Sequence, residues 1–295
     1  PLIAGGEELL EAFKRGSREN WRYILVYLDF DDRKLAIFDK EKRKIILEKE
    51  VPSVVLSAVL DIEEMMLYLA ASSERPGVRW RKNWGWGLLL PRERWWEQVF
   101  LEGKWVVSLD GVYNVIFAES REEYKENKLR IGQNIPNFGC AHWIIRSGKG
   151  KFLHYTTTKD KFRIAWFKAQ EGKIGDTIYE GDCRYWCLES QSEIVKDWLV
   201  TCGSNWKIVA YNLKTGGEKE IYRGEEVLRF CVWDKIDGYS FVIGDSEKLV
   251  FVETDTEMNV KNVEEVKFKH RRVLPLLAGG EELLKAFRRV YEEES

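Results

Sequence analysis

The stretch from residue 198 to residue 224, WLVTCGSNWKIVAYNLKTGGEKEIYRG, contains one complete β-meander. An apolar run at its start is followed by the turn sequence Gly203-Ser204-Asn205, after which residues 207–213 alternate between two faces. A period of two is the signature of a half-buried strand. Glycines at 216 and 217 supply the backbone freedom of a tight turn, and residues 218–222 form the outgoing edge. The stretch therefore predicts three consecutive antiparallel strands.

The same arrangement of apolar strand, short polar turn and alternating strand occurs five more times. These further candidates begin at Tyr23, Met66, Trp105, Phe152 and Tyr239. Their second strands, with that of the first stretch, start near residues 34, 78, 113, 162, 207 and 248, so the repeat length varies from 35 to 49 residues. Such a period matches one four-stranded propeller blade. We expect an all-β fold: a single β-propeller of six blades, with five or seven as alternatives, and short amphipathic helices at both termini.

The hairpin pattern of residues 21–272 resembles that of WD-repeat-like β-propellers. The resemblance implies a closed ring of small sheets, each with two apolar faces that its neighbours bury. The Gly-His and Trp-Asp dipeptides of true WD repeats are absent, and the nearest approach, Val232-Trp233-Asp234, lies in the wrong strand. No binding residue is therefore carried over from that family.

The two ends of the chain are near-copies of each other. Residues 1–15, PLIAGGEELLEAFKR, recur as residues 275–289, PLLAGGEELLKAFRR, with 12 of 15 positions identical at a constant offset of 274. Each copy carries one apolar helical stripe. The stripe residues are Leu9, Leu10 and Phe13 in the first copy, and Leu283, Leu284, Phe287, Val290 and Tyr291 in and after the second. We expect an N-terminal helix in 1–16, the propeller in 17–273 and a C-terminal helix in 274–295.

Several roles are open for the duplicated segments. Residues 266–273 have a strand pattern, and we expect this strand to join residues 21–51 in one sheet, which would close the ring. The two helices would then pair with each other to close the ring or to join neighbouring subunits. Alternatively, they connect tandem modules of about 274 residues.

Composition restricts the class of partner. Lysine and arginine total 47 and aspartate and glutamate 49, so the net charge of −2 gives no overall attraction to nucleic acid or an anionic membrane. No apolar run reaches the roughly 18 residues of a membrane span. The five cysteines are an odd number in a core-rich chain, which favours a reducing compartment, and we expect a cytoplasmic protein.

The sequence offers no assembled reactive centre. Cys140 and His142, and likewise Cys183 and Cys187, have spacings that share a strand face but lack the paired ligands of a zinc site. The chain has three histidines, His142, His154 and His270, and no nucleophile elbow or phosphate-binding glycine loop. Aspartates such as Asp29 and Asp234 fall in turns, where they cap the backbone. We predict no catalytic residue, no metal and no cofactor.

One segment has the composition of a binding surface. It contains Arg79, Trp80, Arg81, Lys82, Trp84, Trp86, Trp95 and Trp96. On a strand the tryptophans would lie on one face and the arginines on the other. Packing of the tryptophan face between blades would therefore account for this composition without a binding role. Tryptophan and arginine also dominate protein interfaces, and aromatic rings beside cations suit single-stranded nucleic acid or a glycan.

Taken together, these patterns predict a non-catalytic protein-interaction scaffold whose terminal helices mediate self-association or link tandem modules. One alternative is an enzyme or glycan-binding propeller with a pocket in its central channel, where Asp, Arg and Trp side chains from several blades would converge. Another is single-stranded nucleic-acid binding through residues 79–96.

Overall fold

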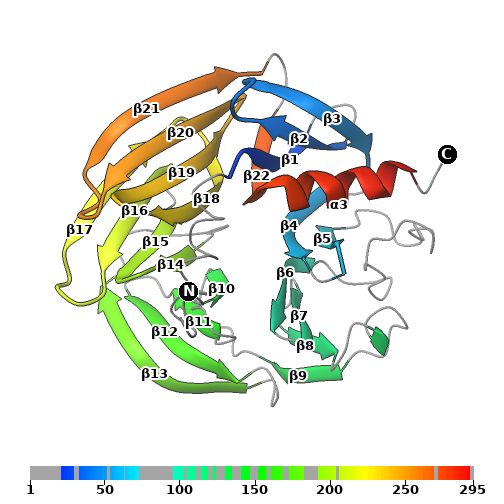
Figure 1. The fold of residues 1–295 in the computed structure, drawn as a ribbon. Coiled ribbons are helices and arrows are strands. Elements are labelled where there is room, and N and C mark those ends of the chain that lie inside the picture. The colour runs from blue at the N-terminus through cyan, green and yellow to red at the C-terminus, as the bar shows by residue number, and fades with distance from the viewer. Residues whose placement is uncertain are drawn as a thin grey trace, which may run out of the picture.

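The computed structural model describes six antiparallel sheets and one terminal helix. The described residues are 21–29, 33–51, 54–62, 64–72, 96–102, 105–110, 114–118, 122–123, 130–134, 141–146, 152–157, 161–168, 173–182, 192–203, 206–268 and 272–292. Figure 1 shows the sheets following one another around a common axis, with the first and last elements of the ring side by side. No helix within these residues is long and apolar enough to cross a membrane.

Within the described residues five sheets have four strands and one has two, and apart from β22 with β1 the paired strands are consecutive in the sequence. Sheet 1 contains β22 (Arg272–Gly279), β1 (Tyr23–Asp29), β2 (Lys34–Asp39) and β3 (Lys44–Glu50). Sheet 2 contains β4 (Val54–Asp61) and β5 (Met66–Ser72), and sheet 3 contains β6 (Trp96–Glu102), β7 (Trp105–Asp110), β8 (Asn114–Ala118) and β9 (Arg130–Asn134). Sheet 4 contains β10 (Ala141–Arg146), β11 (Phe152–Thr157), β12 (Lys161–Lys168) and β13 (Lys173–Asp182). Sheet 5 contains β14 (Ser192–Val195), β15 (Trp198–Gly203), β16 (Lys207–Asn212) and β17 (Glu218–Arg223), and sheet 6 contains β18 (Val227–Lys235), β19 (Gly238–Asp245), β20 (Lys248–Asp255) and β21 (Val260–Lys267).

Strand β1 shows why these sheets assemble around an axis. Tyr23, Leu25 and Tyr27 lie in an apolar cluster with side chains of sheet 2, whereas Ile24, Val26 and Leu28 lie in a second cluster with side chains of sheet 6. All six are at most 5% exposed. Because successive side chains point to opposite faces of a strand, a strand that is apolar on both faces needs a neighbouring sheet on each side.

The last described strand closes the ring. β22 pairs antiparallel with β1, with Tyr23 opposite Gly279 and a bulge between Leu25 and Val26. Pro275 lies opposite Val26, at this bulge and on the innermost strand of the sheet, where a missing N–H is tolerated. A terminal strand pairs with β1, as expected, but its bounds differ from the expected residues 266–273: Val266 and Lys267 end β21, and β22 begins at Arg272. The closing strand instead includes the start of the duplicated sequence.

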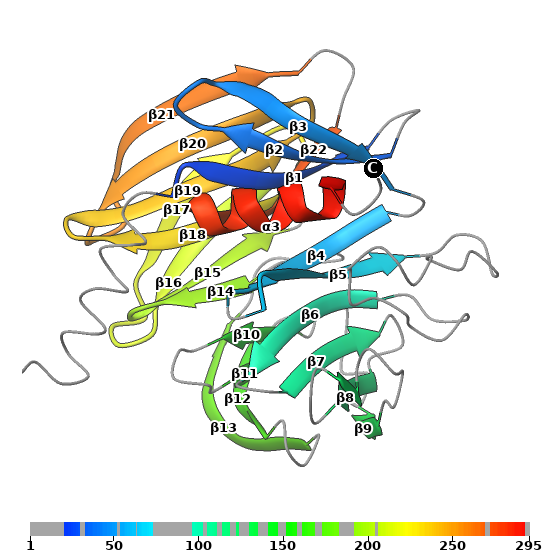
Figure 2. The same ribbon diagram turned by 45° about the vertical axis from the view of Figure 1, so that its right-hand side comes forward.

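Helix α3 (Glu281–Glu292) follows β22 directly and contacts β1, β22 and β5. Figures 1 and 2 both show it lying beside β1 and β4. The boundary expected between propeller and helix at residue 274 therefore lies inside β22. The N-terminal helix expected in residues 1–16 is outside the described residues.

Candidate functional site

The site most distinctive of this chain is the place where α3 docks on sheets 1 and 2. Leu283, Leu284 and Phe287 are 0%, 3% and 0% exposed. They share one apolar cluster with side chains of β1, β4 and β5. We call these cluster residues the docking surface, and residues 275–289 the closing unit. The surface consists of Tyr23, Leu25, Tyr27, Val55, Ala58, Leu67 and Leu69.

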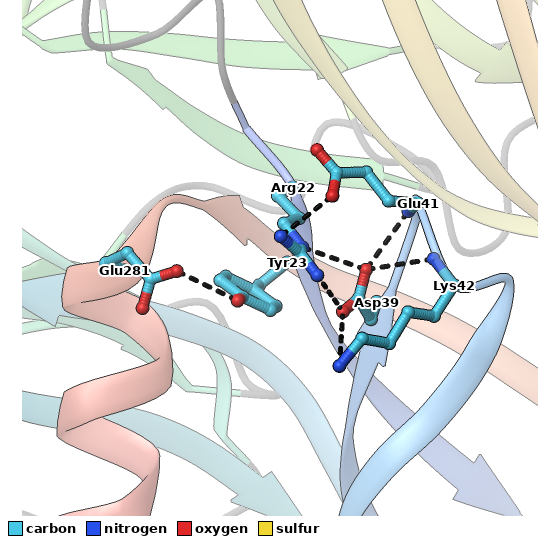
Figure 3. A network of polar contacts seen from close by, with 6 residues as sticks. All are labelled: Arg22, Tyr23, Asp39, Glu41, Lys42 and Glu281. Atoms are coloured by element: carbon cyan, nitrogen blue, oxygen red, sulfur yellow. Dashed lines mark hydrogen bonds and ion pairs between the residues drawn. The ribbon is translucent and has the colours of Figure 1, made fainter.

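Two polar contacts fix the orientation of the helix on this surface. The Tyr23 hydroxyl donates to Glu281 Oε1 over 2.9 Å at the start of α3 (Figure 3). Burial raises the pKa of Tyr23, and the hydrogen bond to Glu281 raises it further, so the hydroxyl stays protonated at neutral pH. Near the other end, Arg289 Nη1 donates to the Glu64 carbonyl oxygen over 3.3 Å. Glu281 also lies in the acidic first turn, where carboxylates favour the helix dipole.

The two glycines between β22 and α3 allow the chain to turn closely onto the helix. A Cβ on Gly279 would lie 3.0 Å from Leu283 Cβ, and one on Gly280 would lie 3.1 Å from Glu282 Oε2. Both distances are tighter than ordinary van der Waals contact. The exposed Glu282 carboxylate can move aside, whereas the buried Leu283 would have to shift, so Gly279 is the glycine that the docked position of the helix favours.

Beside this contact, a buried carboxylate organises the turn after β2 (Figure 3). Asp39 is 0% exposed and accepts from Arg22 Nε over 3.0 Å and Nη2 over 2.7 Å. Its Oδ1 also accepts from the backbone N–H groups of Glu41 and Lys42. The Arg22 hydrogen bonds, with those of the backbone, hold the pKa of Asp39 below its usual value. The carboxylate is thus fully used in holding the turn and has no free face for chemistry.

Other carboxylates have the same kind of structural use. Asp245 is 0% exposed and accepts from the Tyr222 hydroxyl over 2.8 Å and from the backbone N–H of Glu226 over 2.7 Å. It therefore ties the connection between sheets 5 and 6. Asp255 Oδ1 accepts from the backbone of Glu257 and Asn259 in the turn before β21.

Sheets 1 and 6 are joined by rings and ion pairs in addition to their apolar cluster. The rings of Trp21 and Trp233 have centroids 5.2 Å apart. Lys40 Nζ lies 5.8 Å from the Trp233 centroid and 3.5 Å from Glu253 Oε1. Trp233, part of the nearest approach to a Trp-Asp dipeptide, thus contributes to the packing between the first and last sheets.

The cysteines that the structure describes are not reactive nucleophiles. Cys202 and Cys231 are buried thiols that form no disulfide. Burial raises the pKa of Cys202 to about 12 and raises that of Cys231 well above its ordinary value. The thiolate is the reactive form, so these thiols are inert at neutral pH. Cys140, Cys183 and Cys187 lie outside the described residues.

Metal ligands do not gather in the described part of the chain: no group of three or more His, Cys, Asp or Glu residues there has the geometry to hold an ion. His142 and His154 lie on the paired strands β10 and β11, although not opposite each other, and His270 is outside the described residues. The structure thus brings none of the candidate ligands together in the portion that it describes.

The other predicted binding residues are placed only in part. Arg79, Trp80, Arg81, Lys82, Trp84, Trp86 and Trp95 fall outside the described residues, in the connection between β5 and β6. Trp96 is the first residue of β6. Val290 and Tyr291 belong to α3, whereas Leu9, Leu10 and Phe13 are outside the described residues. The docking surface itself was missed from the sequence, although the alternation of β1 could have indicated two buried faces.

No protein-family model matches this sequence, and no curated protein matches it either. Similar solved structures include a chain of a nidogen–laminin complex, 11% identical, with a TM-score of 0.57 over 85% of this chain and 96% of that one. A quinonprotein alcohol dehydrogenase-like protein from Bacteroides thetaiotaomicron is 10% identical, with a TM-score of 0.51 over 89% of this chain and 67% of that one. Both are β-propeller structures.

The fold is that of a β-propeller. At these identities the likeness concerns the fold alone, and propellers of this kind include both interaction domains and enzymes.

Proposed function

We propose that this chain is a six-bladed, non-catalytic scaffold that binds protein and associates with further copies of itself through its duplicated terminal segment. The observation that carries the proposal is that the copies of the closing unit outnumber the described docking surfaces. The sequence holds two copies of the closing unit, at residues 1–15 and 275–289, and the described structure holds one docking surface for it. One copy in each chain is therefore surplus.

A surplus copy has a physical reason to bind another chain. Leu9, Leu10 and Phe13 correspond to Leu283, Leu284 and Phe287, which are almost completely buried in α3. With the docking surface filled by the closing unit, the described part of the chain offers no second surface of this kind for the apolar stripe of the N-terminal copy. Pairing of surplus copies from two chains removes both stripes from water.

The proposal of self-association is tested by measuring mass in solution. We expect size-exclusion chromatography with light scattering to give a multiple of the 34.7 kDa chain mass. The double variant Leu9→Asp/Phe13→Asp should return the mass to that of one chain, because charge on the stripe prevents its burial. Glu11→Lys is the matched control, since it only gives the first copy the residue found at position 285. An unchanged mass in the double variant would contradict the proposal.

Binding of a different protein is supported by the tryptophan- and arginine-rich segment and by the nature of one structural relative. The segment 79–96 supplies the residue types that dominate interface energetics, and the relative belongs to a nidogen–laminin complex. We propose Arg79, Trp80, Arg81, Lys82, Trp84, Trp86, Trp95 and Trp96 as this partner surface. A filter-binding assay at low salt separates it from a nucleic-acid surface, because phosphate binding would appear there and weaken in the triple variant Arg79→Ala/Arg81→Ala/Lys82→Ala. Retention of single-stranded DNA by the unchanged chain, lost in the triple variant, would overturn the assignment to protein.

A further inference from the structure

The side chains with which α3 contacts the docking surface are the same in both copies of the closing unit. Leu283, Leu284, Ala286 and Phe287 are the buried residues of α3, and the offset of 274 places Leu9, Leu10, Ala12 and Phe13 at the equivalent positions. The two polar contacts are also preserved in kind, because Glu7 corresponds to Glu281 and Arg15 to Arg289. Every described side chain of α3 that contacts the docking surface or its rim thus has an identical counterpart in residues 1–15.

The three positions at which the copies differ do not alter the residues that contact the docking surface. Lys285 and Arg288 are exposed, and the N-terminal copy has Glu11 and Lys14 there. Leu277 is half-buried in β22, opposite Leu25, and corresponds to Ile3, an apolar residue of the same size. Gly279, which lies close to Leu283, is retained as Gly5, and Gly280 is retained as Gly6. The differences therefore leave the docking face unchanged.

We propose that the docking surface also binds residues 1–15 of its own chain, as an alternative to residues 275–289. This inference rests on the proposed function in one respect: the copy that is not bound is the one available for self-association. When the N-terminal copy is bound, residues 275–292 are released, and Leu283, Leu284 and Phe287 become the stripe available to another chain. The ring then has two alternative closing units.

The connection to β1 is long enough for this arrangement. Five residues, 16–20, separate the N-terminal copy from Trp21, and six Cα-to-Cα steps span up to about 20 Å. The docked helix advances about 12 Å from the position of Glu281 to that of Arg289. Gly16 follows directly after the last duplicated residue, where glycine commonly ends a helix and reverses the chain. The C-terminal copy instead continues its helix to Glu292.

Charge makes the C-terminal copy the preferred occupant. Glu281 and Lys285 are oppositely charged at a spacing of four on the helix, whereas the equivalent Glu7 and Glu11 have like charge. Such an exchange changes the equilibrium by about two- to fivefold. The observed closure by β22 and α3 agrees with this preference, and the N-terminal closure is expected as the minor population.

Disulfide trapping tests the inference in the full-length chain. Leu25 is 0% exposed and lies opposite Leu277, so a cysteine at 25 is reached only by a strand in this register. The pair Leu25→Cys/Leu277→Cys is the positive control for the observed closure. The pair Leu25→Cys/Ile3→Cys should form a disulfide within one chain, identified by mass spectrometry of peptides and by unchanged mobility on a non-reducing gel. The pair Leu25→Cys/Glu11→Cys is the negative control, because the equivalent position 285 is exposed to solvent whereas Leu25 is buried.

The outcomes separate the inference from the proposed function. An intrachain 3–25 disulfide with the mass of one chain supports alternative closure and counts against self-association. Absence of that disulfide, or its formation only between chains, overturns alternative closure even where light scattering shows an oligomer. A 3–25 disulfide no more abundant than the 11–25 control also overturns it.

A second measurement does not depend on introduced cysteines. If the copies substitute for each other, Phe287→Ala and Phe13→Ala should each leave the midpoint of unfolding nearly unchanged, because the intact copy binds instead. The double variant should then show a loss much larger than the sum of the single effects, a coupling that a double-mutant cycle measures directly. Additive effects of the two substitutions would overturn the inference.

Discussion

At the scale of single residues, aspartate and asparagine side chains hold the turns of the sheets. Asp39, Asn212 and Asp255 each end the third strand of a sheet and accept backbone N–H groups two to four residues later. This is the backbone-capping role that the sequence predicts for aspartates in turns. Their identical position in sheets 1, 5 and 6 is a regularity that the strand pattern alone does not reveal.

Removal of the Asp39 carboxylate should destabilise the fold. We expect Asp39→Ala to lower the free energy of unfolding by about 2–3 kcal/mol, because it removes two hydrogen bonds from Arg22 and two from the backbone. Asn212→Ala should cost about 1 kcal/mol, since its turn is exposed and the Asn212 amide that accepts the backbone N–H groups is uncharged. Urea unfolding followed by circular dichroism measures both. Equal effects of the two substitutions would show that the buried charge pair is not the dominant contribution.

The same carboxylate predicts a dependence on pH. The pKa of Asp39 is lower in the folded chain than in the unfolded one, chiefly through Arg22. Its contribution is therefore complete above the unfolded value of about 4 and disappears as pH falls towards the folded value. We expect the difference in unfolding free energy between the unchanged chain and Asp39→Asn to be constant from pH 7 to about 5 and to shrink below pH 4. A difference that stays constant down to pH 2 would contradict this origin.

At the scale of elements, the packing of β22 depends on a glycine in sheet 6. A Cβ on Gly244 would lie 2.2 Å from the Val273 carbonyl oxygen and 2.7 Å from Pro275 Cδ. Because the first of these atoms belongs to the backbone of the closing strand, it cannot move aside like a flexible side chain. The close approach explains why β19 has no side chain at this point.

Gly244→Ala should therefore disturb ring closure. We expect a loss of about 2 kcal/mol or more in unfolding free energy, the usual range for overpacking in a core. Gly217→Ala is the matched control, since its Cβ would meet only Thr215 Oγ1 at 3.4 Å. Chemical unfolding of the two variants side by side gives the comparison, and an equal response would refute the steric argument.

The elements show how far sequence patterns extend. The meander of residues 198–224 is confirmed as β15, β16 and β17, because alternation and a Gly-Gly turn are strong local signals. The innermost strands were missed: β14 has only four residues, and β18 carries Arg229 and Asp234 among its apolar residues. The closing strand was misplaced because Pro275 and Gly279 suggest a turn, and only pairing with β1 makes them part of a sheet. The docking surface depends on contacts between distant segments and has no local signature.

At the scale of the whole molecule, we expect one closing unit to be sufficient for a stable ring and the ring to be unstable without either copy. Deletion of residues 1–15 leaves every described contact of the docking surface in place, so we expect a thermal midpoint within about 2 °C of the unchanged chain. Deletion of residues 1–15 together with 275–295 removes most of the inner strand of sheet 1 and exposes Leu25 and Tyr27. We expect this chain to lose most of its cooperative unfolding transition in scanning calorimetry, because a large apolar face becomes exposed to water. A sharp transition at the original temperature would contradict the importance of ring closure.

The pairing of β1 with β22 also sets an order of events during synthesis. Between Asp29 and Arg272 lie 242 residues, which a ribosome adds in about 12 to 50 s at roughly 5–20 residues per second. For all of that time β1 lacks β22, its partner in the closed ring, and an unpaired hydrogen-bonding edge of this kind invites aggregation. A nascent chain of this design must keep this edge of β1 protected until β22 has been made, and the alternative closure would place residues 1–15 there in the meantime.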